Sequence, residues 1–239
     1  NPIAYTDGQI VYFNPTTGKK CTNYTESQSK LGVNSGCMKW YVFNDSSSST
    51  KVNLLLDHTL TNSVWTSNSS NRNGPTTALA QLKSDTSNWT GVQTPTNYTW
   101  NGTYAINYSG YKARLITAEE IAQITGNIEW KVTDNKTNFF DSNTVSPSST
   151  CTSGNTTGCK YGWLYDRTGA NCVSRGCLNN TIGEGYITMT YYWTASATLI
   201  NDDKAWIVDN VGRLVLASKD TGVGVGVRPV IEVLKSKLY

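Results

Sequence analysis

The first half of the chain alternates short apolar stretches with polar loops, which is the pattern of antiparallel strands. Three apolar stretches, Gln9–Phe13, Met38–Phe43 and Val52–Asp57, are rich in aromatic, β-branched and leucine residues and predict strands. The second and third are joined by the polar loop 44–50, so we expect them to form a hairpin. The consecutive leucines Leu54–Leu56 predict a strand that is buried on both faces.

Two segments have the spacing of amphipathic helices. The first is Thr76–Lys83, which follows a Gly-Pro pair and has its apolar residues on one face. The second is Thr117–Thr125. Its start has the form of a capping box, because Thr117 is followed three residues later by Glu120, and Gly126 ends the helix.

The second half of the chain contains long stretches rich in Ser, Thr and Asn. We expect a loop over residues 130–160, and no internal repeat or linker separates two cores. The sequence therefore predicts one α+β domain over residues 1–239. The further predicted strands are Tyr111–Ile116, Tyr161–Asp166, Tyr191–Ala195, Ala205–Asp209, Leu214–Ala217 and Val227–Leu234.

The C-terminal region 191–232 combines regular and irregular patterns. Trp193, Trp206 and the Arg228-Pro229 pair stand at predicted strands, and we interpret them as framework. Between them, residues 197–204 and 207–226 mix apolar, charged and glycine residues with no single period. Such a mixture on a rigid frame is typical of a binding surface. From the pattern alone, an ordinary irregular loop with some valines in the core is an equally good interpretation.

Charge and composition exclude several functional classes. The 239 residues carry a net charge of +3 with only 15% charged residues, and there is no polybasic run, so we expect no nucleic-acid partner. No stretch has the length and hydrophobicity of a membrane span, so we expect no membrane contact by this chain. Tyrosine and tryptophan outnumber phenylalanine, which favours half-buried positions and binding surfaces.

The six cysteines form three pairs that are close in sequence. None has CxxC spacing and the only histidine is distant, so a zinc site is not indicated. Cysteine counting alone leaves several connectivities open. Because each local pair brackets a loop rich in glycine and polar residues, we predict the disulfides Cys21–Cys37, Cys151–Cys159 and Cys172–Cys177. Three disulfides predict an oxidising, extracellular environment.

Patterns typical of catalysis are weak. A nucleophilic triad needs a histidine, and the only one, His58, follows a strand that reads as buried and is interpreted as structural. Glycoside hydrolysis needs two facing carboxylates, whereas Glu119 and Glu120 are neighbours on a helix. Asp202 and Asp203 lie in a polar run and are expected to be solvated. We therefore expect no enzymatic activity, no metal site and no cofactor.

The C-terminal motifs nevertheless resemble a known family. YWTASA at 192–197, AWIVDNVGRL at 205–214 and GVRPVIEV at 226–233 resemble the C-terminal signature of bacterial C-type-lectin-like domains. Upstream motifs resemble pilin-like surface proteins of gut Firmicutes, in which a prepilin leader and helix precede such a domain. These motifs are TGKKC at 17–21, SGCMKWY at 35–41, LLLDH at 54–58, YKARLITAEEI at 111–121 and GCKYGWLYD at 158–166.

The resemblance implies a C-type lectin-like fold, with two helices, a twisted antiparallel sheet and long loops tied by disulfides. Calcium-dependent sugar binders of that fold carry a Glu-Pro-Asn or Gln-Pro-Asp loop and a Trp-Asn-Asp strand, and neither motif occurs here. The related formylglycine-generating enzymes use a cysteine near the C-terminus, whereas no cysteine lies beyond Cys177. The resemblance therefore implies neither bound calcium nor that chemistry.

The resemblance also implies a variable binding face. Such domains are frequent targets of diversity-generating retroelements, which rewrite adenines of Asn-type codons. Most residues at 197–203, 207–218 and 223–225 are reachable from such codons, whereas Lys204 and Lys219 are not. The residues that we expect to form the ligand-binding face are Thr198, Leu199, Ile200, Asn201, Asp202, Asp203, Ile207, Asp209, Val211, Arg213, Leu216, Ser218, Val223 and Val225.

These expectations combine into one functional hypothesis. The chain is expected to be an extracellular recognition module, displayed on a bacterial surface or pilus, whose partner is a protein or another cell-surface ligand. Its leader and anchoring helix are expected to lie upstream of residue 1. Two alternatives stay open, a structural pilin-like subunit that contacts pilus subunits and a glycan-binding or carbohydrate-active domain.

Overall fold

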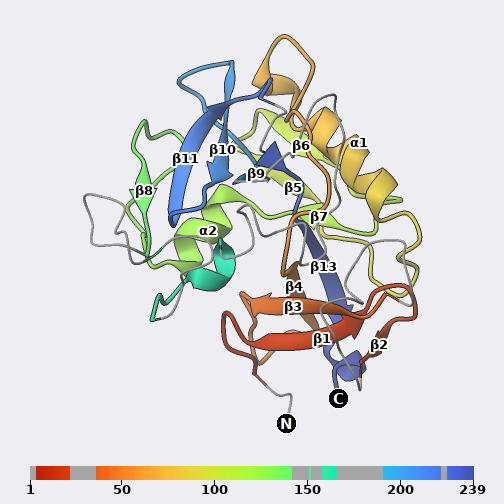
Figure 1. Ribbon diagram of the computed structural model, residues 1–239. Coiled ribbons are helices and arrows are strands. Elements are labelled where there is room, and N and C mark those ends of the chain that lie inside the picture. The colour runs from red at the N-terminus through yellow and green to blue at the C-terminus, as the bar shows by residue number, and fades with distance from the viewer. Residues whose placement is uncertain (1–3, 22–35, 142–150, 152–157, 166–190, 222–224) are drawn as a thin grey trace, which may run out of the picture.

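The computed structural model describes residues 4–21, 36–141, 151, 158–165, 191–221 and 225–239 (Figure 1). These residues form two larger sheets, a small hairpin and two α-helices, so the chain is an α+β protein as the sequence predicts. Among them, none of the helices has the length and apolar character that crossing a bilayer requires.

The first sheet has six strands and joins the two ends of the chain. Its spatial order is β2 (Lys19–Lys20), β1 (Ile10–Asn14), β3 (Met38–Phe43), β4 (Lys51–Leu56), β13 (Pro229–Leu234) and β7 (Arg114–Leu115). All neighbours are antiparallel, and β3 and β4 form the expected hairpin. Strand β13 is inserted between β4 and β7, where Val230 lies opposite Leu55 and Arg114. The C-terminal residues therefore complete a sheet that begins near residue 10.

The second sheet carries most of the C-terminal region. Its spatial order is β12 (Val225–Gly226), β9 (Tyr191–Ala197), β10 (Lys204–Val208), β11 (Arg213–Ser218) and β8 (Asn138–Phe139). Only the β12–β9 pair is parallel. A separate hairpin is formed by β5 (Tyr98–Trp100) and β6 (Tyr104–Ile106). Strands β9 to β11 form the platform on which the expected binding face is carried.

The two helices lie where the sequence predicts them. Helix α1 (Thr76–Asp85) extends two residues beyond the predicted end, and α2 (Ala118–Ile124) has Thr117 as its N-cap. The Thr117 hydroxyl accepts from the Glu120 N–H, and the Glu120 carboxylate accepts from the Thr117 N–H, so the capping box is confirmed. Short 3₁₀ turns lie at η2 (Asn71–Asn73), η3 (Gly162–Leu164) and η5 (Lys235–Lys237).

One buried cluster includes residues of both sheets, and three of its tryptophans also join the second sheet to neighbouring loops by hydrogen bonds. The Trp193 indole N–H donates to the Ser63 carbonyl at 2.7 Å, and the Trp65 indole N–H donates to the Thr194 carbonyl at 2.9 Å. This reciprocal pair fastens the segment before η2 to β9. Trp206 donates to the Val132 carbonyl at 3.1 Å. Trp65, Trp193 and Trp206 thus each bury a large apolar ring and satisfy the one donor that the ring carries.

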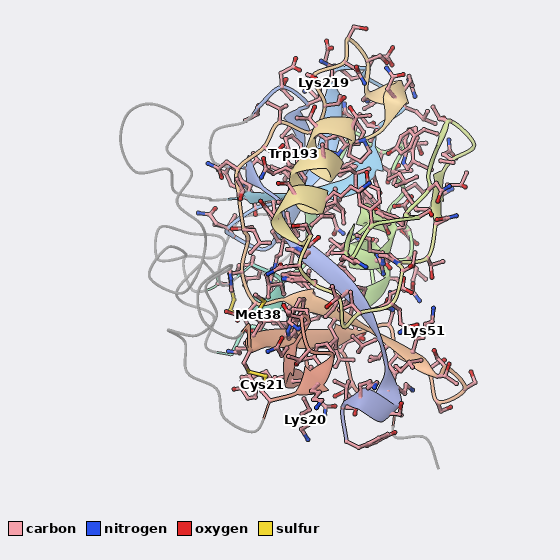
Figure 2. The ribbon with its side chains drawn as sticks, turned by 90° about the vertical axis from the view of Figure 1, so that its right-hand side faces the viewer. Lys20, Cys21, Met38, Lys51, Trp193 and Lys219 are labelled. Carbon is pink, nitrogen blue, oxygen red and sulfur yellow. A yellow bond between two sulfur atoms is a disulfide. The ribbon has the colours of Figure 1, made fainter. Side chains whose placement is uncertain are left out.

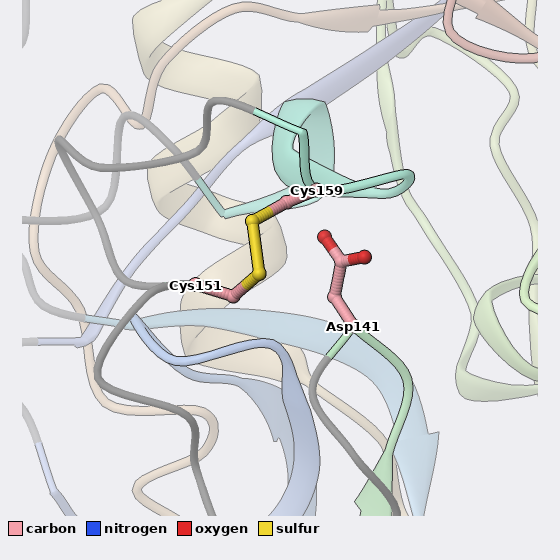
Figure 3. A group of neighbouring side chains, drawn as sticks. All are labelled: Asp141, Cys151 and Cys159. Carbon is pink, nitrogen blue, oxygen red and sulfur yellow. A yellow bond between two sulfur atoms is a disulfide. The ribbon is translucent and has the colours of Figure 1, made fainter.

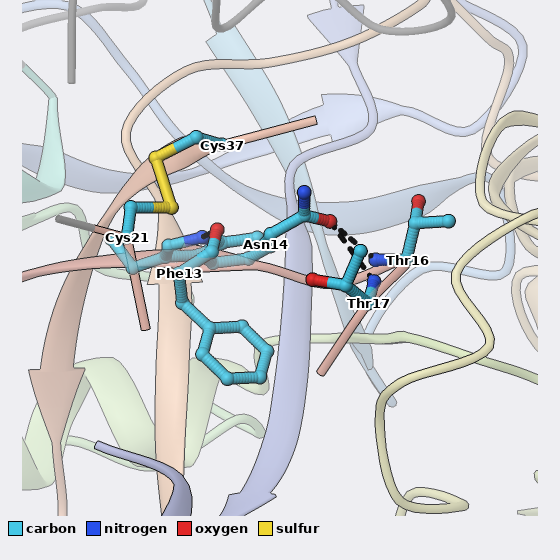
Figure 4. The surroundings of a disulfide bond; sticks show 7 residues. Phe13, Asn14, Thr16, Thr17, Cys21 and Cys37 are labelled. Carbon is cyan, nitrogen blue, oxygen red and sulfur yellow. Dashed lines mark hydrogen bonds between the residues drawn. A yellow bond between two sulfur atoms is a disulfide. The ribbon is translucent and has the colours of Figure 1, made fainter. Parts of the chain in front are cut away.

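Two of the three predicted disulfides are confirmed. Cys21–Cys37 closes a separation of 16 residues beside the turn after β1, where the Asn14 side chain accepts from two successive backbone N–H groups (Figure 4). Cys151–Cys159 closes a separation of 8 residues. The predicted pair Cys172–Cys177 lies outside the described residues. Two disulfides indicate an oxidising environment outside the cytoplasm.

Two predicted strands differ from the structure, and one hairpin was not predicted. Residues of the predicted strand Tyr161–Asp166 form the turn η3 instead, because Gly162 and the following residues make local i to i+3 hydrogen bonds. The predicted strand Tyr111–Ile116 is reduced to the two residues of β7. The β5–β6 hairpin was not predicted, since it lies in a stretch rich in Asn and Thr.

The two ends of the described chain lie at one pole of the molecule. The C-terminus and the sheet formed by β1 to β4 occupy the lower part of Figure 1, whereas the loop between β9 and β10 lies at the top. Figure 2, turned by 90°, agrees: Lys219 lies at the upper end, and Lys20, Cys21 and Lys51 lie at the lower end. The expected binding face and the termini are therefore on opposite ends.

Candidate functional site

The residues expected to form the binding face separate into three groups by exposure. Ile200, which is 50% exposed, leads an exposed group that continues with Asn201, Asp202, Asp203 and Ser218. Partly buried side chains form the second group: Leu199, Val211, Arg213 and Leu216. The third group is buried: Thr198, Ile207, Asp209 and Val225. Val223 lies outside the described residues. The accessible part of the face is thus the loop 199–203, which we name the recognition loop, together with Ser218.

The expectation of solvent exposure is wrong for the buried group. Successive side chains of a strand point to opposite faces, yet both Trp206 and Ile207 of β10 are buried, Ile207 with 3% of its surface exposed. Ile207 lies opposite Val215 and Trp193, so β10 is covered on both faces. Val225 is buried in β12 beside Tyr191. Strands buried on both sides have no alternating polar face, which is why the pattern did not separate core from surface.

Asp209 is buried because it holds the turn between β10 and β11. Its carboxylate accepts from the backbone N–H groups of Val211 and Arg213, both at 3.0 Å, and pairs with the Arg213 guanidinium. Gly212 takes the positive φ of 75° that closes the turn. Burial raises the pKa of Asp209, and the hydrogen bonds and the Arg213 charge only partly oppose that shift. Asp209 and Arg213 are therefore turn residues.

The recognition loop is fixed by a residue far away in the sequence. The side-chain amide nitrogen of Asn71 lies 3.0, 2.9 and 2.7 Å from the backbone carbonyls of Thr198, Asn201 and Lys204. The Asn71 backbone N–H donates to the Asp202 carbonyl at 2.8 Å. Asn71 is itself fully buried. One side chain therefore holds both ends and the middle of the loop.

Two further residues complete this attachment, which we name the clamp: Asn71, Arg72 and Lys219. Arg72 donates to the Leu199 carbonyl at 2.9 Å and pairs with the Asp202 carboxylate at 2.6 Å. The Lys219 backbone N–H donates to the Asp203 carbonyl at 2.7 Å. Only the Arg72–Asp202 pair and a 4.0 Å approach of the Lys219 ammonium to Asp203 involve side chains of the loop. The other clamp contacts are hydrogen bonds to backbone carbonyls. The side chains of Ile200, Asn201 and Asp203 are left exposed to solvent.

The residues expected to be framework are buried. Trp193, Trp206 and Arg228 are each 0% exposed. The Arg228 guanidinium donates to four backbone carbonyls, with distances of 2.6 Å to Leu56 and 2.6 Å to Leu164, and it lies over the Tyr192 ring. The Arg228 side chain therefore holds β4, η3 and β9 together.

Asp141, Cys151 and Cys159 lie close enough to suggest a metal site, but the two cysteines form a disulfide. Asp141 lies beside Cys151 and Cys159, but the two sulfur atoms are bonded to each other (Figure 3). The Asp141 carboxylate accepts from the Tyr161 N–H at 3.0 Å and from the Tyr165 hydroxyl at 2.8 Å. A disulfide offers no thiolate ligand, so this group anchors the η3 turn.

The residues considered for catalysis are not brought together. His58 is fully buried, and its nearest charged partner is the Asp57 carboxylate at 3.8 Å. Glu119 accepts from Ser196 and Tyr98, whereas Glu120 accepts from Arg114 and from its own helix N-terminus. The two glutamates therefore belong to separate networks, as their adjacency on the helix predicted.

Sequence patterns did not indicate Asn71 or Arg72 as functional residues. Asn71 and Arg72 precede the loop by about 130 residues and stand in a polar stretch with no distinguishing period. Lys219 was marked indirectly, because a lysine cannot be reached from an Asn-type codon by changing its adenines, unlike most residues of the expected variable positions. Comparison with known proteins adds no assignment: no family model, no curated protein and no solved structure matches this chain.

Proposed function

We propose that this chain is an extracellular ligand-binding module that recognises its partner through the recognition loop and Ser218. The single observation that carries the proposal is the clamp. Asn71 and Arg72, which lie outside the C-terminal region, and the Lys219 N–H fix the loop backbone, and the side chains of Ile200, Asn201 and Asp203 stay exposed. A preorganised backbone lowers the entropy cost of binding.

The same observation supports diversification of the loop by a retroelement in a C-type lectin-like fold. Because the clamp binds carbonyl oxygens, which every residue type has, side chains in the loop can change without loss of the attachment. The two helices, antiparallel strands and disulfide-tied loops are compatible with that fold. Display on a bacterial surface or pilus fits the position of the loop at the end opposite the C-terminus (Figure 1).

Binding is tested with the purified chain on beads and a panel of intact bacterial cells and purified surface proteins. The comparison variant is Ile200→Ser combined with Asp203→Ser, and the matched control is Lys237→Ser at the opposite end of the molecule. We expect binding that the loop variant loses and the control keeps. Equal binding by all three proteins would contradict recognition through this loop.

Diversification has its own test. Sibling genes and any nearby template repeat are sequenced, and substitutions are expected to concentrate at the exposed positions 200–203 and 218 while Asn71 and Arg72 stay fixed. Identical residues at 197–225 in all copies would rule out diversification, although not binding.

One observation favours the structural-subunit alternative. Near the termini, a groove of about 330 Å³ is lined by Tyr5, Tyr12, Leu238 and Tyr239, and Ile10 beside it is 46% exposed. Exposed apolar surface of this kind can mediate self-association. Sedimentation over a wide concentration range separates the two functions, since assembly that Ile10→Ser and Tyr239→Ser abolish would favour the subunit.

A further inference from the structure

Strand β11 has a neighbour along its whole length on one side but only at its start on the other. Toward β10, its register runs from Leu214 to Ser218. Toward β8, only Arg213 and Leu214 have a partner. Residues 215–218 therefore form an edge of the second sheet, and no other described strand pairs with them there. We name these residues the open edge.

The backbone groups of successive residues in an antiparallel strand point alternately to its two sides. The Lys219 N–H donates to the Asp203 carbonyl at 2.7 Å, so the odd-numbered residues of β11 face β10. Leu216 and Ser218 therefore direct their N–H and C=O groups away from β10. The Ser218 carbonyl accepts from the Thr221 N–H at 3.0 Å. The remaining groups, the Leu216 N–H and C=O and the Ser218 N–H, have no hydrogen-bond partner among the described residues.

The open edge lacks the features that usually prevent pairing with another chain. Exposed edges of soluble proteins are commonly very short, or they carry charges or proline. The first sheet follows this rule, because its outer strand β2 is the two-residue strand Lys19–Lys20. The open edge reads Val-Leu-Ala-Ser, with no charge and no proline, and its side chains are partly buried or exposed. Its unpaired N–H and C=O groups are therefore available to an extended chain of another molecule.

The open edge ends beside the recognition loop. Ser218 lies opposite Lys204, the first residue after that loop. Lys219 follows the edge directly, belongs to the clamp and lies at the upper end of the molecule in Figure 2. A partner that contacts the loop can therefore continue along the edge without leaving this end of the molecule.

The side chains along the edge determine which partner fits. Leu216 lies opposite Trp206 and shares its face of the sheet, whereas Val215 and Ala217 lie on the other face. A strand added at the edge would place one side chain beside Leu216 and its two neighbours beside Val215 and Ala217. All three positions are apolar, so β-branched and other uncharged residues fit them better than charged residues.

We propose that the open edge binds an extended, uncharged segment of the partner protein, which pairs with β11 as an additional strand. This inference rests on the proposed function and specifies the partner as a polypeptide. Backbone hydrogen bonds to Leu216 and Ser218 contribute affinity that does not depend on the side chains of the recognition loop, and those side chains add specificity.

The test uses a phage-displayed library of random heptapeptides, which is selected on the immobilised full chain. Enriched sequences are synthesised, and their binding to the chain in solution is titrated by fluorescence anisotropy. We expect the enriched peptides to be rich in valine, isoleucine and threonine and poor in charged residues.

Ser218→Pro is the decisive variant. Proline removes the outward N–H and places its ring where the added strand would lie, so peptide binding should weaken by at least about tenfold. The fold should tolerate this change, because the missing N–H is not part of the ladder with β10. Ser218→Ala loses only the hydroxyl and should weaken peptide binding less than Ser218→Pro does.

The matched control is Lys20→Pro, which places a proline at an edge of the first sheet. The Cys21 N–H donates to the Tyr12 carbonyl at 3.0 Å, so the N–H of Lys20 also faces away from its neighbouring strand. Lys20 lies at the lower end of the molecule in Figure 2, far from the open edge. Lys20→Pro should therefore leave peptide binding unchanged.

A second measurement changes the peptide instead of the protein, in case Ser218→Pro is unstable. N-methylation of every second amide removes the donors from one edge of an extended peptide. We expect methylation of one alternate set of amides to abolish binding and methylation of the other set to preserve it.

The proposal is wrong if no selected peptide binds the wild-type chain, if Ser218→Pro binds the peptides as well as Lys20→Pro does, or if both methylated sets bind equally. Self-association of the wild-type chain that Ser218→Pro abolishes would assign the edge to a second copy instead. In each of these cases, loss of cell binding by Ile200→Ser/Asp203→Ser would still support recognition through the loop, so the two proposals fail separately.

Discussion

The side-chain amide nitrogen of Asn71 lies 2.7 Å from the backbone carbonyl oxygen of Lys204, 133 residues further along the chain. With the Thr198 and Asn201 carbonyls on the same nitrogen, this contact converts the connection between β9 and β10 into a fixed loop. The relationship also fixes the orientation of the amide, since three carbonyls can be faced only by the NH₂ group.

Asn71→Ala should destabilise the protein by about 2–3 kcal/mol. The loop carbonyls lose their hydrogen-bond donor, and the removed side chain leaves a cavity. Urea unfolding measures this change. Asn73→Ala is the matched control, because Asn73 is exposed and its side chain makes only a 3.3 Å contact with Ser70. Equal stability of the two variants would show that the loop does not depend on Asn71.

Substitutions at exposed loop positions should have little effect on stability. Ile200→Asn and Asp203→Tyr are expected to change the free energy of unfolding by less than about 0.5 kcal/mol, since both side chains are exposed and the clamp holds Asp203 mainly through its backbone carbonyl. Thr198→Tyr, at a fully buried position of the same expected face, should cost about 1–3 kcal/mol through overpacking. Thermal unfolding of the three variants measures whether a position's exposure, rather than its place in the expected face, determines how well it tolerates substitution.

Asp209 should give a distinctive pH dependence. Because burial raises its folded-state pKa above the ordinary value of 3.8, the unfolded chain loses this proton first as the pH rises. Its contribution to stability is therefore largest in acid and declines from near pH 4 upward, until the folded pKa is passed. The difference in unfolding free energy between wild type and Asp209→Asn, measured from pH 3 to 7, should show this decline.

A second variant separates charge from hydrogen bonding at the same position. Asp209→Asn keeps an oxygen for the Val211 and Arg213 N–H groups, whereas Asp209→Ala leaves both without their acceptor. We expect the alanine variant to be less stable than the asparagine variant by about 1–2 kcal/mol at neutral pH. A flat pH difference for Asp209→Asn would mean that the carboxyl is not desolvated.

The two disulfides should contribute unequally. Replacing both cysteines of Cys21–Cys37 by serine is expected to cost about 3 kcal/mol, and the same change at Cys151–Cys159 about 2.5 kcal/mol, because the second pair closes a shorter segment. Urea unfolding of each double variant provides the values. A larger loss from the second pair would point to strain or native contacts as the dominant effect.

Local signals predicted much of the fold. The capping box of α2, the hairpin of β3 and β4, and two disulfides each depend on residues close in sequence, and each is confirmed. The η3 turn was missed because its stretch is rich in aromatic residues, which are also typical of strands. The β5–β6 hairpin was missed because its strands have only 3 residues each and lie in a stretch rich in Asn and Thr.

The candidate site was predicted only in part, for a related reason. Ile200 to Asp203 form a solvated loop, which a polar run indicates directly. Burial of Ile207 and Val225 depends on what covers both faces of their strands, and Asp209 is buried because its own turn closes around it. The Asn71 contact joins segments more than a hundred residues apart, and nothing near Asn71 in the sequence marks it as special.

The position of β13 has a consequence for how the protein is made. Val230 pairs with Leu55 and with Arg114, so the first four strands are not joined to β7 until β13, residues 229–234, is in place. During synthesis, the edges of β4 and β7 that pair with β13 therefore stay open until that later segment has been made. Emergence of residues 229–234, rather than of any earlier segment, is the event that allows the native sheet to close.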